Sequence, residues 1–162
     1  MDRIFYCDGS CRKNPGPGGF GVIELVKYNE DTYVNYSYNE QCEDTTNNRE
    51  ELKAILHIFE MAEKDKNTNY IIYSDSAYCV NIVNNWIYNW AKNNWLNSKK
   101  KIVENIDLIQ ILYKYINTEF FNCQVIKTAG HCGIIENELA DALATNNLVK
   151  YNSLIEKYDI KK

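Results

Sequence analysis

Three features that would assign a protein to a particular class are missing from this sequence. Its six cysteines include no Cys-x-x-Cys pair, which argues against a zinc site and a disulfide framework, so we expect reduced thiols. It contains no apolar run long enough to span a bilayer and begins with no signal-peptide pattern. We therefore expect a cytoplasmic protein without a membrane partner.

An excess of positive charge is also missing, since the net charge is −4. No overall positive field attracts the protein to nucleic acid, so any contact with a polyanion must be local or assisted by a metal ion. With 162 residues, 45% of them hydrophobic, and no internal repeat or linker, the chain suits one globular domain. We assign this domain to residues 1–150 and expect residues 151–162, with mixed charge and little pattern, to be a poorly anchored C-terminal tail.

Two apolar runs of strand length end in an aspartate. Residues 4–7 precede Asp8, and residues 70–74 precede Asp75. A helical crossover between the two runs would make the strands parallel and bring both aspartates to the same edge of a sheet. Two neighbouring carboxylates both stay ionised only beside a cation, which indicates a metal site. Taken alone, Asp8 could instead only shape the Asp8-Gly9 turn.

The remaining pattern predicts an α/β fold. Thr46 and its neighbours supply capping groups for an amphipathic helix that continues to Lys64, with apolar residues at helical spacing. The other expected elements are strands at residues 20–26, 32–38 and 123–127, a short helix at 76–83, a helix at 106–116, a loop at 128–135 and a helix at 136–148. This order predicts a mixed sheet with helices on both faces, and a ligand site where the strand order reverses.

Helical spacing separates the two adjacent glutamates of the first helix. Glu51 lies about 75° from the centre of the apolar face, whereas Glu50 lies nearly opposite that face. We therefore expect Glu51 to look along the sheet and Glu50 to face water. The same reasoning places Asp141 away from Leu139 and Leu143, as expected for a solvated acid.

Five motifs, in this order, carry a family resemblance. They are Asp8-Gly9-Ser10-Cys11 with Asn14-Pro15-Gly16-Pro17-Gly18-Gly19, Thr46-Asn47-Asn48-Arg49-x-Glu51-Leu52, Ser74-Asp75-Ser76, the segment from Asn85-Trp86 to Trp95, and Gly130-His131-x-Gly133 with Glu136-Asn137-Glu138-x-x-Asp141. Over nearly its whole length the chain resembles a type 1 ribonuclease H. The resemblance implies the ribonuclease H-like fold, with a five-stranded mixed sheet in the order 3-2-1-4-5, and makes Asp141 a site residue.

The resemblance also implies the chemistry. The chain is expected to be an endonuclease that hydrolyses the RNA strand of RNA/DNA hybrids, leaves 3′-hydroxyl and 5′-phosphate ends, and acts as a monomer. Two Mg²⁺ ions about 4 Å apart, with Mn²⁺ as a substitute, would activate water and stabilise the leaving oxygen. Asp8 would bridge both ions, Asp141 would hold the ion that activates water, and Glu51 and Asp75 would hold the other. His131 would aid proton transfer or product release. We expect the other histidine, His57, to be a helix-surface or packing residue.

The resemblance further implies how the hybrid is bound. The 2′-hydroxyls of the RNA strand would be read around Cys11, Asn14, Asn47 and Glu51. The DNA strand would contact Thr46, Asn48, Asn105, Tyr78, Trp86 and Trp90. Clustered tryptophans also pack cores, so Trp90 and Trp95 could serve that role alone.

Two departures from the family pattern should weaken contacts with DNA phosphates. Asp44 stands where many relatives carry an arginine, and the segment after Lys92 continues with Asn93 and Asn94 where relatives are more basic. The lysines at residues 99–101 would restore part of this contact.

Other classes of protein fit less well. Residues 16–21 match G-x-G-x-x-G, but that dinucleotide-binding motif must open a helix, and residues 22–26 read as a strand. A non-catalytic hybrid-binding module would be supported by the loss of a carboxylate, and all four are present. An integrase would not explain Asn47, Asn48 and the tryptophan segment.

Overall fold

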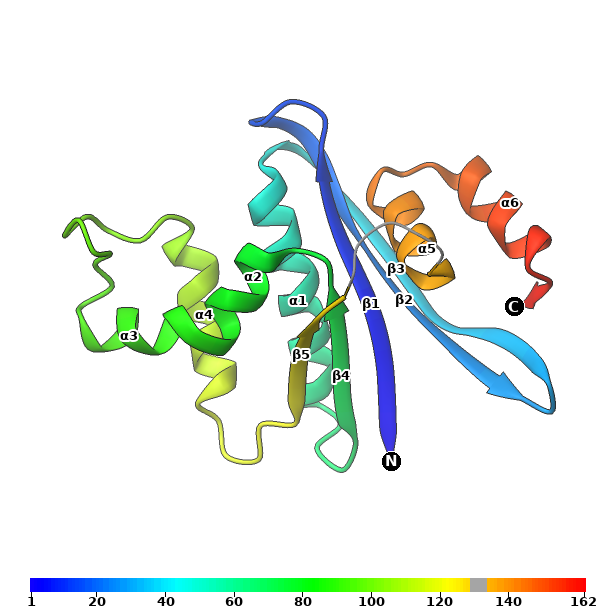
Figure 1. Ribbon diagram of the computed structural model, residues 1–162, viewed down its shortest axis with the longest axis horizontal. Coiled ribbons are helices and arrows are strands. Elements are labelled where there is room, and N and C mark those ends of the chain that lie inside the picture. Colours follow the sequence, from blue (N-terminus) through cyan, green and yellow to red (C-terminus); the bar gives the residue numbers. More distant parts are fainter. Residues whose placement is uncertain (129–133) are drawn as a thin grey trace.

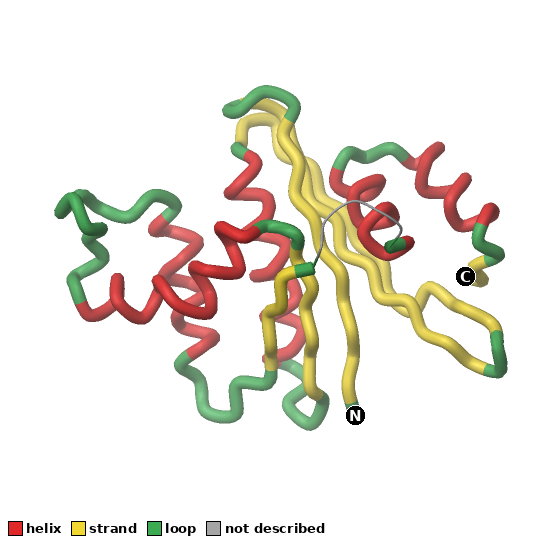
Figure 2. Tube along the Cα trace, in the orientation of Figure 1, coloured by secondary structure: helices red, strands yellow, loops and turns green. Residues whose placement is uncertain are grey.

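The computed structural model describes residues 1–128 and 134–162 and contains one mixed β-sheet covered by helices (Figures 1 and 2). In the described residues the strand order across the sheet is β5-β4-β1-β2-β3-β6. The strands are β1 (Asp2–Cys11), β2 (Gly16–Tyr28), β3 (Asp31–Thr45), β4 (Asn69–Ser74), β5 (Cys123–Lys127) and β6 (Ile160–Lys161).

Strand pairing confirms the predicted order 3-2-1-4-5 and adds a sixth strand. β1 is antiparallel to β2 and parallel to β4, which in turn is parallel to β5. β2 and β3 are longer than the predicted strands, because polar residues continue their pairing as far as Gly16 and Thr45. The added strand, β6, lies parallel to β3.

The helices follow the apolar spacing closely in the first two thirds of the chain. Thr46 caps the first helix by accepting a hydrogen bond from the Arg49 backbone, as predicted. The helical segments are α1 (Asn47–Glu63), α2 (Ala77–Asn81), a π-helical turn (Ile82–Trp86), α3 (Ile87–Lys92), α4 (Ile106–Ile116), α5 (Ile135–Ala144) and α6 (Leu148–Lys157). No helix in the described part of the chain is long and apolar enough to cross a membrane.

Two hydrophobic cores lie on the two faces of the sheet. The larger packs α1 and α4 against β1 and β4 and includes Phe5, Leu52 and Ile72. The smaller packs α5 and α6 against β2 and centres on Ile23 and Leu139. The expected arrangement, with helices on both faces, is therefore confirmed (Figure 1).

The C-terminal segment corrects one prediction. The helix expected at residues 136–148 ends at Ala144, and a second helix, α6, packs back with Tyr151, Leu154 and Ile155 buried. β6 then joins the sheet beside β3. The expectation of poor anchoring after Lys150 is wrong, because these apolar side chains complete the smaller core. The division into a domain at residues 1–150 and a tail at 151–162 stays a prediction.

Candidate active site

Three carboxylates from separate elements meet at one edge of the sheet. The parallel pairing of β1 with β4 aligns Cys7 with Ser74, so the next residues, Asp8 and Asp75, are neighbours at the carboxyl ends of the two strands. Glu51 joins them from α1, and one oxygen of each of the three carboxylates lies within 4.8 Å of the other two. Sequence spacing predicted all three members of this cluster.

Two glycines let helices approach the sheet beside Asp8. A Cβ atom on Gly9 would collide with the backbone of Glu50 and Glu51, so α1 can approach β1 this closely only at a glycine. Gly21 pairs with Asp8 in the β1–β2 register, and a Cβ atom there would meet the backbone of α5. These close approaches position the helices that carry Glu51 and Asp141 next to Asp8.

The cluster holds more negative charge than its surroundings stabilise. Burial, followed by the charge of Asp75, raises the pKa of Asp8 to about 7. Burial and the neighbouring Asp8 raise the pKa of Glu51 well above its ordinary value. The Oε2 atom of Glu51 is buried and has no hydrogen-bond partner in the described structure. Oxygen-only ligands, crowded charge and an unpartnered buried oxygen fit a hard divalent cation.

Asp141 lines a cavity of about 160 Å³ together with Asp8 and Asp75. Its side chain is 46% exposed and accepts a hydrogen bond from Lys150 Nζ at 2.9 Å. Helical spacing correctly kept Asp141 off the buried side of α5. It did not reveal that Asp141 faces the same cavity as the two strand aspartates.

Three further residues line this cavity and were not predicted as site residues. Asn137 and Glu138 belong to the first turn of α5, and Lys150 belongs to α6. Asn137 Nδ2 donates to Thr128 Oγ1 at 3.0 Å. For Asn137 and Glu138 the available signal was their spacing from Asp141, four and three residues on one helix. For Lys150 the signal was the apolar spacing of Tyr151, Leu154 and Ile155, which identifies a helix where we expected a tail.

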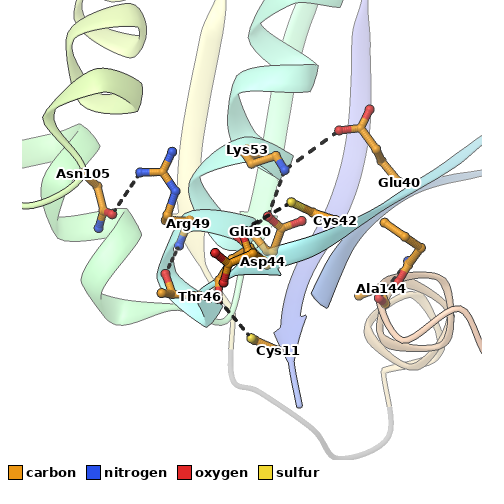
Figure 3. Close-up of polar contacts among 12 residues, drawn as sticks. Cys11, Glu40, Cys42, Asp44, Thr46, Arg49, Glu50, Lys53, Asn105 and Ala144 are labelled. Atoms are coloured by element: carbon orange, nitrogen blue, oxygen red, sulfur yellow. Dashed lines mark hydrogen bonds and ion pairs between the residues drawn. The ribbon is translucent and has the colours of Figure 1, made fainter. Parts of the chain in front are cut away.

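Glu50 contradicts its predicted position. Its side chain is fully buried, and Oε2 accepts hydrogen bonds from Thr45 Oγ1 at 2.7 Å and Lys53 Nζ at 2.9 Å. Figure 3 shows Lys53 reaching both Glu50 and Glu40. The prediction that Glu50 faces water failed because β3 continues to Thr45 and covers this side of the helix.

The residues expected to read the RNA strand lie around the start of α1. Asn14 Oδ1 accepts a hydrogen bond from the Asn47 backbone at 2.8 Å, which joins two of the predicted residues directly. The Cys11 thiol lies within 3.5 Å of the Thr45 and Gly16 carbonyl oxygens. A second cavity of about 360 Å³ joins this region to the carboxylates and is lined by Asn47, Asn48, Glu51, Asp75 and Asp141, among others.

The residues expected to contact the DNA strand surround an arginine. Arg49 Nη1 donates to Asn105 Oδ1 at 3.3 Å. The backbone N–H of Arg49 donates to Thr46 Oγ1 (Figure 3). The same guanidinium forms an ion pair with Asp107 at 2.7 Å. Asn105 Nδ2 in turn donates to the Tyr78 hydroxyl at 3.4 Å. Thr46, Asn105 and Tyr78 thus form one connected polar surface.

The tryptophans divide between exposed and packing positions. Trp86 is 39% exposed and lies against Tyr78 and Trp90, with ring centroids 6.2 and 5.9 Å away. Trp95 packs edge-on against Tyr113 at the larger core. Packing is therefore part of what Trp90 and Trp95 do, as the alternative interpretation anticipated.

Of the two histidines, His57 lies in the described part of the chain. It stacks on Tyr38 and hydrogen-bonds the Tyr36 hydroxyl at 2.7 Å, which confirms a packing role. Burial lowers the pKa of its imidazole. The predicted site residue His131 lies outside the described residues.

Comparison with known proteins identifies the family. The RNase H family model matches residues 1–149. The chain belongs to the RNase H family. A ribonuclease H of Orientia tsutsugamushi is 39% identical over 145 residues, covering 90% of this chain and 81% of that protein. A ribonuclease H of Caldicellulosiruptor saccharolyticus is 41% identical over 143 residues, covering 87% and 92%.

Solved RNase H structures share the fold. LC9-RNase H1, described as a type 1 RNase H with the type 2 active-site motif, superposes with a TM-score of 0.74 at 25% identity, covering 94% of this chain and 73% of that one. LC11-RNase H1 in complex with an RNA/DNA hybrid superposes with a TM-score of 0.62 at 19% identity, covering 91% and 99%. The similarity to LC11-RNase H1 shows a shared fold and nothing more.

Proposed function

We propose that this RNase H hydrolyses the RNA strand of RNA/DNA hybrids, with Asp8, Glu51, Asp75 and Asp141 as ligands of two Mg²⁺ ions. The observation that carries the proposal is that three carboxylates meet, with one oxygen of each within 4.8 Å of the other two. Asp8 comes from β1, Glu51 from α1, and Asp75 from the end of β4. Family membership adds the reaction: divalent-metal-dependent cleavage of the RNA strand.

The carboxylates account for the need for a cation. Because burial and mutual repulsion raise the pKa values of Asp8 and Glu51, a cation between the two groups would favour the ionised form of both. Glu51 Oε2 supplies a buried acceptor that a cation would satisfy. Bound Mg²⁺ supplies Lewis-acid chemistry, lowering the pKa of water and stabilising the leaving 3′-oxygen. Mn²⁺, with similar oxygen ligands, would substitute.

The role proposed for each carboxylate is the one that the family resemblance implies. Asp8, Asp75 and Asp141 line both cavities, and Asp8 would contact both ions. Glu51 and Asp75 would orient the ion on the leaving side. Asp141, on α5, would orient the ion that activates water. His131 would aid proton transfer or product release, and the products would carry 3′-hydroxyl and 5′-phosphate ends.

Substrate choice would come from the surface around α1. Asn14 and Asn47, joined by a hydrogen bond, together with Cys11 would recognise 2′-hydroxyls, the group that separates RNA from DNA. The surface of Thr46, Asn48, Asn105 and Tyr78 would hold the DNA strand, with Trp86 and Trp90 along its groove. A monomeric state and a cytoplasmic location remain predictions from the sequence.

Cleavage of end-labelled duplexes tests the proposal. We expect the purified chain to cut the RNA strand of a hybrid in millimolar Mg²⁺ or Mn²⁺, to leave RNA/RNA and DNA/DNA duplexes intact, and to be inactive in EDTA. A 5′-phosphate end is identified if the product accepts a new 5′-label only after phosphatase treatment, since a 5′-hydroxyl end would accept the label without it. Binding of the hybrid without cleavage in either metal would overturn the proposal in favour of a non-catalytic hybrid-binding module.

A further inference from the structure

A lysine from the C-terminal helix occupies the edge of the carboxylate site. Lys150 Nζ lies 2.9 Å from Asp141 Oδ2, and Lys150 lines the cavity that Asp8, Asp75, Glu138 and Asp141 share. It is the one basic residue among the described residues lining that cavity. Neither the four-carboxylate arrangement nor the proposed reaction requires a positively charged side chain at this position.

The fold holds Lys150 in place from several directions. Its backbone N–H donates to Asn147 Oδ1 at 3.0 Å, which caps α6, and the Asn147 N–H donates to the Ala142 carbonyl of α5 at 2.8 Å. One residue later Tyr151 enters the smaller core, followed by Leu154 and Ile155. The lysine therefore projects from a docked helix.

Asp141 differs from the other three carboxylates in a way that matches this ion pair. Among the described residues, the group of ligand oxygens within 4.8 Å of one another contains Asp8, Glu51 and Asp75 and omits Asp141. Asp141, the carboxylate outside this group, is the one that forms an ion pair with Lys150.

We propose that Lys150 is a built-in competitor of the divalent ion for Asp141. In the ion-free protein the ammonium group neutralises Asp141 and draws its carboxylate toward α6. An ion that binds Asp141 must displace this ammonium and tolerate a positive charge nearby, so Lys150 weakens ion binding at that carboxylate. The proposal rests on the assignment of Asp141 as an ion ligand in the proposed function.

The size of the effect follows from the exposure of the pair. Both side chains are partly exposed, 40% for Lys150 and 46% for Asp141, so their attraction is modest and the ion can displace it. Repulsion between the ammonium and a divalent ion a few ångströms away adds a second modest penalty. Removing the charge should tighten Mg²⁺ binding about three- to tenfold.

Ion binding without substrate tests this directly. Mg²⁺ is titrated into ¹⁵N-labelled protein without nucleic acid, and the shift of the Gly9 and Asp141 amide signals gives the dissociation constant. We expect Lys150→Gln to lower this constant about three- to tenfold, and Lys150→Arg to leave it near the wild-type value because the charge remains. Lys157→Gln, the same charge change near the far end of α6, is the control and should have little effect.

Two outcomes would overturn the proposal. The first is equal Mg²⁺ affinity in wild type and Lys150→Gln; if the KM for the hybrid is then raised, Lys150 is a phosphate-binding residue instead. The second is an equal gain in Lys157→Gln, which would show a general charge effect. Thermal melting verifies that each variant is folded. Failure of the proposed function would appear separately, as absence of hybrid cleavage by the wild-type protein.

Discussion

At the scale of the residue, charge and burial oppose each other at Asp8. It is held between Asp75 and Glu51, and its pKa is raised to about 7 by burial and by the charge of Asp75. We expect Asp8→Asn to abolish hybrid cleavage, because a neutral isostere loses affinity for the ion. Without Mg²⁺ at pH 8 the same change should leave stability unchanged or raise it by about 1–3 kcal/mol, since it removes a repelled charge. Cleavage assays and urea unfolding in EDTA measure the two effects. Near-normal cleavage at millimolar Mg²⁺ would contradict the assignment.

Neutralising Glu51 should mainly reduce catalysis, whereas neutralising the adjacent Glu50 should mainly reduce stability. Glu51→Gln should reduce cleavage by orders of magnitude with little loss of stability, because Glu51 faces the carboxylate cluster. Glu50→Gln should instead reduce stability by about 1–3 kcal/mol, because it weakens buried hydrogen bonds to Thr45 and Lys53. Its cleavage per folded molecule should remain close to wild type. Urea unfolding and turnover at saturating hybrid separate the two effects, and equal catalytic losses would show that Glu50 also reaches the site.

At the scale of the element, the junction of β3 and α1 presents an acid beside the expected DNA-binding surface. Asp44 is exposed and lies two residues before the helix cap Thr46 (Figure 3). If the DNA strand follows Thr46 and Asn105, screened repulsion by Asp44 costs on the order of 1 kcal/mol. Asp44→Arg should then lower KM for the hybrid several-fold with little change in kcat. It should also steepen the salt dependence by about one unit of slope for each additional phosphate that the protein neutralises.

A neighbouring acid supplies the control for this variant. Glu43 is also exposed, and consecutive side chains of a strand point to opposite faces. Glu43→Arg makes the same charge change away from the expected phosphate and should alter KM less. Identical KM values and salt slopes in wild type and Asp44→Arg would show that Asp44 does not face the DNA strand.

The C-terminal helix α6 is a second element whose contribution can be measured. Leu154 is 9% exposed and packs in the smaller core, so Leu154→Ala should reduce stability by about 2–3 kcal/mol. Val149→Ala, at a position 80% exposed on the same helix, should change stability by less than about 0.5 kcal/mol. Urea unfolding measures both. A Leu154→Ala variant as stable as wild type would mean that α6 is not docked as described.

At the scale of the whole molecule, the carboxylate cluster should couple stability to pH and to Mg²⁺. The pKa of Asp8 rises from 3.8 to about 7 on folding, so between these values the folded state holds a proton that the unfolded state has released. Without Mg²⁺, this group makes stability fall as pH rises from about 4 to 7, with no further loss above that range. The raised pKa of Glu51 acts in the same direction.

Mg²⁺ should reverse this trend because it binds the ionised carboxylates. We expect the gain in melting temperature from added Mg²⁺ to be larger at pH 8 than at pH 5, and to be reduced in Asp8→Asn. Melting curves at several pH values in EDTA and in Mg²⁺ provide the comparison. A gain that does not depend on pH would contradict ionisation of the cluster on binding.

Local pattern was enough to predict most of this molecule. The runs before Asp8 and Asp75, the apolar spacing of α1 and the capping residue Thr46 are properties of short segments, so their elements could be predicted without knowing what they pack against. The parallel relation of the two strands then required only a helical crossover between them, which brought Asp8 and Asp75 together. Family resemblance supplied Asp141, which spacing alone assigned to solvent.

Relations between distant segments could not be obtained in that way. Burial of Glu50 depends on Thr45, at the end of a strand whose length is set by pairing with β2. The ion pair of Lys150 with Asp141 depends on α6 folding back onto the smaller core, so that a residue at the edge of the expected loose tail reaches the carboxylate site. Helical spacing shows which side of a helix is apolar, but the environment of a polar side chain is set by whichever segment packs over it.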